Sequence, residues 1–154
     1  MIAVVGPGGA DVDGETLAAA EEVGRLLARA GHVVVTGGLD GVMAAASRGA
    51  KQAGGIGVAL LPGDDAAAAN EFADVVIPTG LGQGRNVLVV RSADAVVAVG
   101  GSWGTLSEVA IAMRQAKPVV WLRGWTVAGP EPSVPSASSA EEAVASVLAR
   151  VSAP

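Results

Sequence analysis

The sequence predicts an α/β fold in which a doubly wound, mostly parallel sheet carries helices on both faces. Short runs rich in β-branched residues alternate with helical patterns along almost the whole chain. The runs are apolar throughout, as in strands of a parallel sheet that is covered on both sides. Many of the 22 glycines gather where these runs end, which is where turns between strands and helices would lie. Together these features predict a Rossmann-like architecture.

The first half of the chain supplies three predicted strands and two predicted helices. The strands are the apolar runs Ile2–Val5, Val33–Thr36 and Ile56–Leu61. The first helix, Glu15–Ala30, has leucines and a valine spaced along one side and stops at a glycine. The second helix, Gly41–Ala53, connects the second and third strands.

The second half continues the alternation and then departs from it. Further strands are expected at Val75–Pro78, Ala95–Val99 and Val119–Leu122. Helices are expected at Val87–Ser92, within a longer segment from about Gly84, and at Thr105–Gln115. Residues 124–139 are rich in Pro and Ser and precede a last helix near Ala140–Val151. This segment is interpreted as a tether for the closing helix or, alternatively, as a flap over a site.

The composition disfavours several classes of protein. A chain of 154 residues has the length of one ordinary domain, so we expect a single domain over residues 1–154. The net charge of −5 disfavours nucleic-acid binding, which depends on basic side chains. The absence of cysteine excludes disulfides, and with one histidine no metal site is expected. No signal peptide or bilayer-spanning run stands out, so we expect a soluble, cytoplasmic protein without a membrane partner.

One segment carries more functional information than any other. The apolar run that ends at Val99 passes through Gly100, Gly101, Ser102, Trp103, Gly104 and Thr105 directly into a helical pattern. Such a turn presents free backbone N–H groups and the positive end of a helix dipole to one point, which suits a phosphate. We therefore expect this segment to bind a phosphorylated ligand. For Trp103 three interpretations stay open: stacking on a base, covering the cleft of a partner subunit, or plain packing.

Other glycine clusters follow other predicted strands. They comprise Gly6, Gly8 and Gly9, then Gly37 and Gly38, and finally Gly80–Gly84. Because ligands bind beyond the carboxyl ends of the strands in such sheets, Gly6, Gly8, Gly9, Gly37 and Gly38 are candidate ligand-binding residues. The alternative is that they only form tight connections. Neither a dinucleotide-type GxGxxG nor a GxxxxGK[ST] phosphate loop occurs.

Three polar residues near these clusters are candidates for direct roles. Arg85 begins a helix, where a cation is unfavourable unless an anion lies nearby; the alternative is a solvated arginine in a surface salt bridge. Asn86 is a candidate hydrogen-bond donor to the ligand. Glu108 fits a capping box in which Thr105 is the N-cap, and the alternative is a catalytic carboxylate.

The combination of Gly80–Gly84, Arg85 and the run GGSWGTLSE resembles the Lonely Guy phosphoribohydrolases. Those proteins carry an Arg-Lys pair followed later by Pro-Gly-Gly-x-Gly-Thr-x-x-Glu. The turn Thr36–Met43 and the pair Arg85-Asn86 are most similar to a DprA/Smf-related branch, the one that includes the molybdenum cofactor carrier proteins. The resemblance covers about residues 1–122.

This resemblance implies a homodimer or larger homo-oligomer and leaves two functions open. A carrier would bind a phosphorylated, nucleotide-like ligand, such as a nucleotide or a molybdenum cofactor of the molybdopterin type. An enzyme would cleave the N-glycosidic bond of a nucleoside 5′-monophosphate to base and ribose 5-phosphate, with Arg85 and Glu108 as the catalytic pair. Asn86, Gly100 and Ser102 replace the Lys, the Pro and the second Gly of the hydrolase motifs. These departures favour the binding protein.

Overall fold

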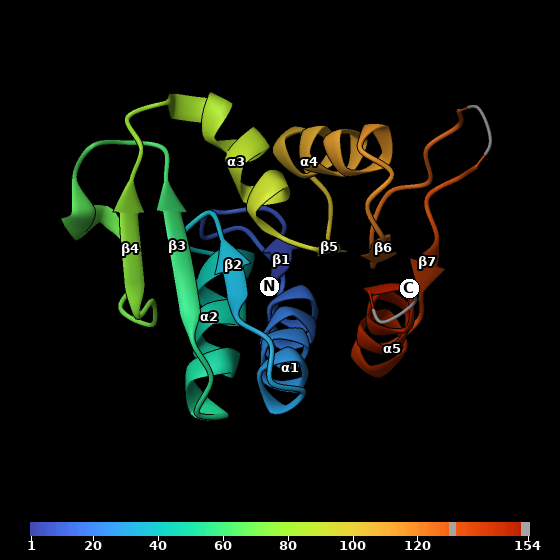
Figure 1. The fold of residues 1–154 in the computed structure, drawn as a ribbon, viewed down its shortest axis with the longest axis horizontal. Coiled ribbons are helices and arrows are strands. Elements are labelled where there is room, and N and C mark those ends of the chain that lie inside the picture. The colour runs from blue at the N-terminus through green and yellow to red at the C-terminus, as the bar shows by residue number, and fades with distance from the viewer. Residues whose placement is uncertain (130–131, 152–154) are drawn as a thin grey trace.

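The structure is a computed structural model that describes residues 1–129 and 132–151. A seven-stranded sheet lies between two layers of helices (Figure 1). Its strands are β1 (Ile2–Val5), β2 (Val34–Thr36), β3 (Gly57–Leu61), β4 (Val75–Pro78), β5 (Ala95–Val99), β6 (Val119–Leu122) and β7 (Ser136–Ala137). The strand order is β4-β3-β2-β1-β5-β6-β7, and every neighbouring pair is parallel.

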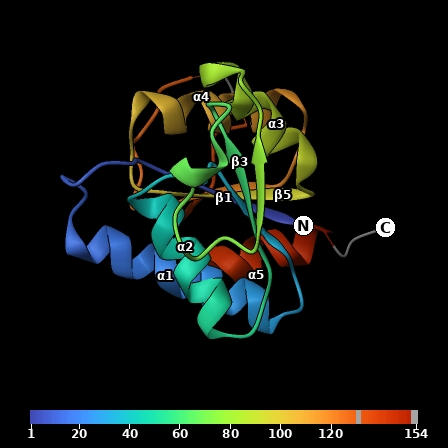
Figure 2. The same ribbon diagram turned by 90° about the vertical axis from the view of Figure 1, so that its left-hand side faces the viewer.

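The helices divide between the two faces of this sheet. One face carries α1 (Gly14–Arg29), α2 (Val42–Gln52) and α5 (Ala140–Val151), and the other carries α3 (Arg85–Ser92) and α4 (Trp103–Arg114) (Figures 1 and 2). Two 3₁₀ turns, η1 (Ala66–Ala68) and η2 (Gly82–Gly84), lie in connections. The predicted doubly wound α/β fold is confirmed.

The strand order places a switch point between β1 and β5. From β1 the chain runs outward through β2 and β3 to β4, then returns to pair β5 with the other side of β1. The connections that leave β1 and β5 therefore depart to opposite faces, with α1 on one and α4 on the other. Ligands of open α/β sheets bind in the crevice that such a divergence creates.

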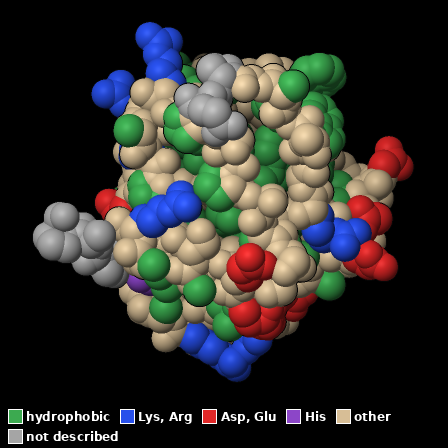
Figure 3. All heavy atoms as spheres, turned by 90° about the vertical axis from the view of Figure 1, so that its right-hand side faces the viewer, with side chains coloured by type: hydrophobic (Ala, Val, Ile, Leu, Met, Phe, Trp, Pro, Cys, Tyr) green, Lys and Arg blue, Asp and Glu red, His purple; other side chains and the backbone are tan. Residues whose placement is uncertain are grey.

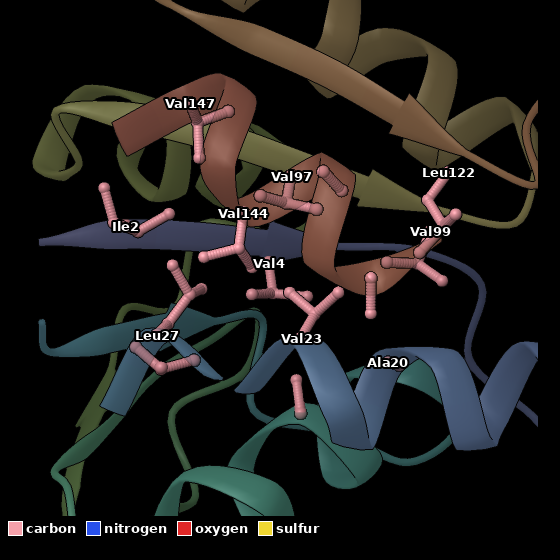
Figure 4. Close-up of a cluster of buried hydrophobic side chains, with 14 of the residues drawn as sticks. Ile2, Val4, Ala20, Val23, Leu27, Val97, Val99, Leu122, Val144 and Val147 are labelled. Atoms are coloured by element: carbon pink, nitrogen blue, oxygen red, sulfur yellow. The ribbon is translucent and has the colours of Figure 1, made fainter. Parts of the chain in front are cut away.

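A hydrophobic core fills each face of the sheet, and β5 contributes to both. All five residues of β5 are buried. Val97 and Val99 pack with α1, α2 and α5 (Figure 4), whereas Val96 and Ala98 pack with α3 and α4. Because successive strand residues point to opposite faces, an uninterrupted apolar run is what a doubly covered strand requires.

The structure refines the predicted boundaries and adds one strand. Strands β1, β4, β5 and β6 and helix α5 have the predicted bounds, and the ends of the other predicted elements move by at most two residues. Strand β7 was not predicted, because its two residues lie inside the Pro/Ser-rich segment 124–139. It pairs through Trp121↔Ser136 and Leu122↔Ala137, so this part of the segment extends the sheet. Residues 130–131 of the segment lie outside the described residues.

No helix in the described part of the chain has the length and apolar character needed to cross a bilayer. On the face beside β7 and α5, Lys and Arg side chains are dispersed and Asp and Glu side chains lie among them (Figure 3). This face therefore lacks a gathered basic patch.

Helices α1 and α2 cross with their backbones in contact, and two glycines allow it. A Cβ at Gly24 would overlap the carbonyl group of Ala46, and a Cβ at Gly49 would overlap that of Glu21. The ion pair between Arg48 and Glu21, at 2.6 Å, spans the same crossing. Small residues at this crossing are therefore a packing requirement and not a sign of ligand binding.

We expect Gly49→Ala to destabilise the protein by about 1–3 kcal/mol, because the added methyl group must push two backbones apart. Glycine-to-alanine changes inside helices usually stabilise by about 0.5–1 kcal/mol, so the sign is reversed here. Gly14→Ala at the start of α1 is the control, since a Cβ there meets nothing within 4 Å. Urea unfolding of both variants checks this, and a Gly49 variant as stable as Gly14→Ala would contradict the close crossing.

Candidate functional site

A cavity of about 420 Å³ opens at the carboxyl ends of the strands, beside the switch point between β1 and β5. The last residue of β1 lines it, together with residues of the connections and helices that follow β1, β2, β3, β4 and β5. They are Val5, Gly6, Gly8, Gly37, Leu39, Met43, Pro62, Gln83, Arg85, Asn86, Ser102, Trp103, Gly104, Thr105, Ser107 and Glu108. The volume is within the range of small-molecule sites.

Most residues singled out from the sequence meet in this cavity. They are Gly6, Gly8, Gly37, Arg85, Asn86, Ser102, Trp103, Gly104, Thr105 and Glu108. Four predicted glycines lie elsewhere. Gly100 and Gly101 line a separate cavity with Arg123, Gly38 packs against Ala59 and Leu61, and the N–H of Gly9 donates to Asp40 at 2.8 Å.

The residues that sequence analysis missed are mainly apolar. Val5, Leu39, Met43 and Pro62 form part of the lining, together with Gln83 and Ser107. Leu39 lies in the glycine-rich turn after β2 and Met43 lies in the first turn of α2, so the glycines of this segment were the signal that could have pointed to both. An apolar side chain gives no chemical indication of its own that it faces a ligand instead of the core.

Helix α4 begins two residues earlier than predicted, and this corrects the capping interpretation. Ser102 has an extended backbone, and its Oγ accepts a hydrogen bond from Thr105 N at 3.1 Å. Ser102 is therefore the N-cap, and Thr105 is the third helical residue. The capping box with Thr105 as the N-cap is wrong, and Glu108 lies in the second turn, away from the end of the helix. The N–H groups of Trp103 and Gly104 have no partner within α4 and belong to residues that line the cavity.

Arg85 is buried at the first position of α3, which corrects the alternative of a solvated surface arginine. The residue is 7% exposed, and its guanidinium lies against Gly37, where a Cβ would overlap Nη1. Its Nε is the single buried side-chain N or O atom without a hydrogen-bond partner in the described part of the chain. Burial lowers the pKa of Arg85, and the charge of Glu108 opposes this shift. A buried cationic donor without a partner is costly unless a ligand completes it.

Glu108 is also buried, at 6% exposed, on the face of α4 that borders the cavity. Burial raises the pKa of its carboxyl to about 8, although the charge of Arg85 acts to lower it. Among the ion pairs of the described residues none joins Glu108 to Arg85. The carboxyl group is therefore mainly protonated at neutral pH, and the site carries a net positive charge from Arg85.

Asn86 and Ser107 connect α3 to α4 at the cavity wall. Asn86 Nδ2 donates to Ser107 Oγ at 3.3 Å, and Ser107 Oγ donates to the carbonyl of Gly104 at 2.7 Å. The two side chains fix the position of the N-terminus of α4 relative to Arg85. No group of three or more His, Cys, Asp or Glu among the described residues is placed to hold a metal ion.

We expect Gly37→Ala to weaken anion binding at least about tenfold, because the methyl group would displace the Arg85 guanidinium. Gly63→Ala, where a Cβ meets nothing within 4 Å, is the matched control. Titration with inorganic phosphate checks the effect. Equal phosphate affinity in the two variants would show that the guanidinium position does not matter for binding.

Sequence comparison identifies the family of the chain. Residues 1–151 match the SLOG cluster4 family. The chain belongs to the SLOG cluster4 family. A relative in this comparison is an uncharacterized protein of Archaeoglobus fulgidus, which is 48% identical over 123 residues, or 80% of each chain.

Solved structures similar to this SLOG cluster4 protein include a binding protein and a carrier protein of the molybdenum cofactor. The molybdenum cofactor binding protein of the phototrophic bacterium Rippkaea orientalis is 37% identical, with a TM-score of 0.91 over 98% of this chain and 96% of that one. The molybdenum cofactor carrier protein of Chlamydomonas reinhardtii is 36% identical, with a TM-score of 0.82 over 96% and 97%. The resemblance to the carrier branch is confirmed.

A more distant likeness concerns the fold alone. DNA processing protein A of Streptococcus pneumoniae is 20% identical, with a TM-score of 0.73 over 95% of this chain and 61% of that one. The shared architecture confirms that the SLOG cluster4 protein has the Rossmann-like fold of this wider group.

Proposed function

We propose that the cavity binds a phosphorylated small molecule through Arg85, and that the ligand is a molybdenum cofactor that the protein carries. The observation that carries the proposal is the buried Nε of Arg85, which lacks a partner among the described residues and belongs to a side chain lining the cavity. A phosphate oxygen is the acceptor that best suits a guanidinium, because the two groups match in charge and geometry.

Two further features support a phosphate in this cavity. The N-terminus of α4 brings the N–H groups of Trp103 and Gly104 to the same lining as Arg85. A helix N-terminus favours an anion through its free N–H groups and its dipole. Since Glu108 is mainly protonated at neutral pH, it does not repel the anion.

The proposed cargo follows from the comparisons. Two solved structures at 36–37% identity, each covering nearly the whole chain, are described as a binding protein and a carrier protein of the molybdenum cofactor. That cofactor has a phosphate group and a pterin with a planar aminopyrimidinone ring, and both suit a cavity of about 420 Å³ with a cationic end. When bound, the cofactor would bring its own molybdenum, so this chain need supply no cluster of metal ligands.

Two further proposals concern nucleic acid and the assembly of several copies of this chain. We propose that the protein does not bind nucleic acid, which is supported by its net charge of −5 and by the dispersed basic side chains on the face that Figure 3 shows. We also propose a homodimer or larger homo-oligomer. Size-exclusion chromatography with light scattering, and a filter-binding assay with single-stranded DNA, test these two points.

Cofactor retention tests the main proposal. The protein is incubated under exclusion of air with molybdenum cofactor released from a molybdoenzyme, then separated from free cofactor by gel filtration. We expect about one molybdenum per chain by mass spectrometry for the wild type and for Arg91→Ala, an exposed arginine of the same helix. We expect Arg85→Ala to retain none. Retention by Arg85→Ala, or none by the wild type, would count against the proposal.

A second candidate function is hydrolysis of a nucleoside 5′-monophosphate. The observation that favours it is a carboxyl group with a pKa of about 8 in the same cavity as a buried arginine. A carboxylic acid that stays protonated near neutral pH can protonate the leaving base as the glycosidic bond breaks. Release of ribose 5-phosphate from AMP, present in the wild type and absent in Glu108→Gln, would establish this activity. No release from either protein would leave the carrier function alone.

A further inference from the structure

A tryptophan that lines the cavity contacts a second tryptophan that is distant from it in sequence. Trp103 is the first residue of α4 and lines the cavity, and Trp125 follows β6. Their ring centroids are 5.3 Å apart with the ring planes at 78°, an edge-to-face contact. Trp103 is nevertheless 79% exposed. The contact therefore supports Trp103 while most of its surface remains free.

The segment after β6 is built to hold Trp125 in this position. Trp121 Nε1 donates to the carbonyl of Gly100 at 2.6 Å, which ties β6 to the turn before α4. Gly124 lies directly on the indole of Trp121, where any side chain would overlap the ring. Trp125 in turn lies against Gly101, and a Cβ on Gly101 would overlap the indole of Trp125. The turn that begins α4 and the ring that supports Trp103 are thus fixed together.

The cavity has more room and more apolar lining than a phosphate alone requires. Its volume of about 420 Å³ is in the range of whole small-molecule ligands. Leu39, Met43 and Pro62 contribute apolar surface to the same cavity that Arg85 lines. A ligand anchored by its phosphate would therefore have an apolar or aromatic body, and Trp103 offers a free aromatic surface for it.

We propose that Trp103, supported by Trp125, is the platform on which the planar heterocyclic ring of the phosphorylated ligand stacks. The inference rests on the proposed function for the phosphate end of the ligand and adds recognition of the ring. Stacking of a base on an aromatic side chain contributes about 5- to 150-fold in affinity. Trp125 acts through Trp103 and is a positioning residue.

Two probes that share a ribose 5-phosphate, one with and one without a heterocyclic ring, test the platform. GMP and ribose 5-phosphate carry the same phosphate, and the guanine of GMP shares its aminopyrimidinone ring with a pterin. Isothermal titration of the wild type should show GMP binding about tenfold or more tightly than ribose 5-phosphate. In Trp103→Ala the ratio of GMP affinity to ribose 5-phosphate affinity should fall to about 1, while the affinity for ribose 5-phosphate itself is kept. Trp103→Phe should retain part of this ratio.

Variants of Trp125 and of a distant residue complete the test. Trp125→Ala should lower the ratio partway and Trp125→Phe should restore it, whereas Ile56→Ala, an exposed apolar residue outside the cavity lining, should leave it unchanged. An unchanged ratio in Trp103→Ala would overturn the platform, as would equal binding of both probes by the wild type. A change of oligomeric state in Trp103→Ala with an unchanged ratio would assign Trp103 to a subunit interface instead. If neither probe binds, the proposed phosphate site itself fails.

Discussion

Replacing Arg85 by methionine will abolish tight ligand binding and at the same time stabilise the free protein. The guanidinium is 7% exposed, and its Nε has no hydrogen-bond partner among the described residues. Losing a buried charged donor to an anion costs about 2–5 kcal/mol of binding, or at least about 30-fold in affinity. Methionine has a similar length without the charge, so the free protein no longer bears the cost of an unpaired buried cation.

Two measurements on the same variants check this trade-off. Phosphate titration gives the affinity, and urea unfolding gives the free energy of unfolding. Arg91→Met removes a positive charge from the exposed side of the same helix and should change neither quantity much. An Arg85→Met variant that is less stable than the wild type would indicate a structural role for the guanidinium in place of ligand binding.

Glu108→Gln will stabilise the protein at alkaline pH by an amount that grows as the pH rises. The carboxyl has a pKa of about 8 in the folded protein against an ordinary value of 4.5, because it is buried. Between these values the folded protein holds a proton that the unfolded chain has released, so stability falls as pH rises. At about 1.4 kcal/mol per pKa unit, the loss across this window reaches as much as about 5 kcal/mol.

Glutamine at position 108 keeps the shape of the protonated carboxyl and does not titrate. The free energy of unfolding of Glu108→Gln should therefore exceed that of the wild type by several kcal/mol at pH 9, with little difference near pH 4.5. The control is Glu71→Gln, which changes an exposed carboxylate. Parallel stability curves for the wild type and Glu108→Gln between pH 5 and 9 would show that burial does not protonate Glu108.

The strands were predictable from the sequence because a doubly covered parallel sheet demands continuous apolar runs. Strands β1, β4, β5 and β6 begin and end where those runs do. Strand β7 was not predictable, since two residues among prolines and serines carry no periodicity. Its pairing with β6 depends on tertiary contact, shown by the hydrogen bond from Trp121 N to the carbonyl of Pro135 at 2.8 Å.

The candidate site was predictable where glycine turns follow strands. It was less predictable where two nearby residues suit the same structural role. Ser102 and Thr105 both suit an N-cap, and only the backbone conformation shows that Ser102 takes it. That one difference moves Glu108 from a capping position to a buried one. Gly100 and Gly101 look like the other turn glycines in sequence, yet Trp125 occupies the space beside Gly101. The cap was a choice between two hydroxyl residues three positions apart, and the contact at Gly101 comes from a segment distant in sequence, so the glycine pattern predicts neither.

A crystal structure of the protein with bound molybdenum cofactor is the most direct test of the central claim, that Arg85 binds the phosphate of the ligand. We expect a phosphate oxygen at about 2.7–3.2 Å from a nitrogen of the Arg85 guanidinium, with the phosphate beside the first N–H groups of α4. Occupancy of the neighbouring cavity that Asp13 and Arg123 line, with no ligand atom on the Arg85 guanidinium, would contradict it.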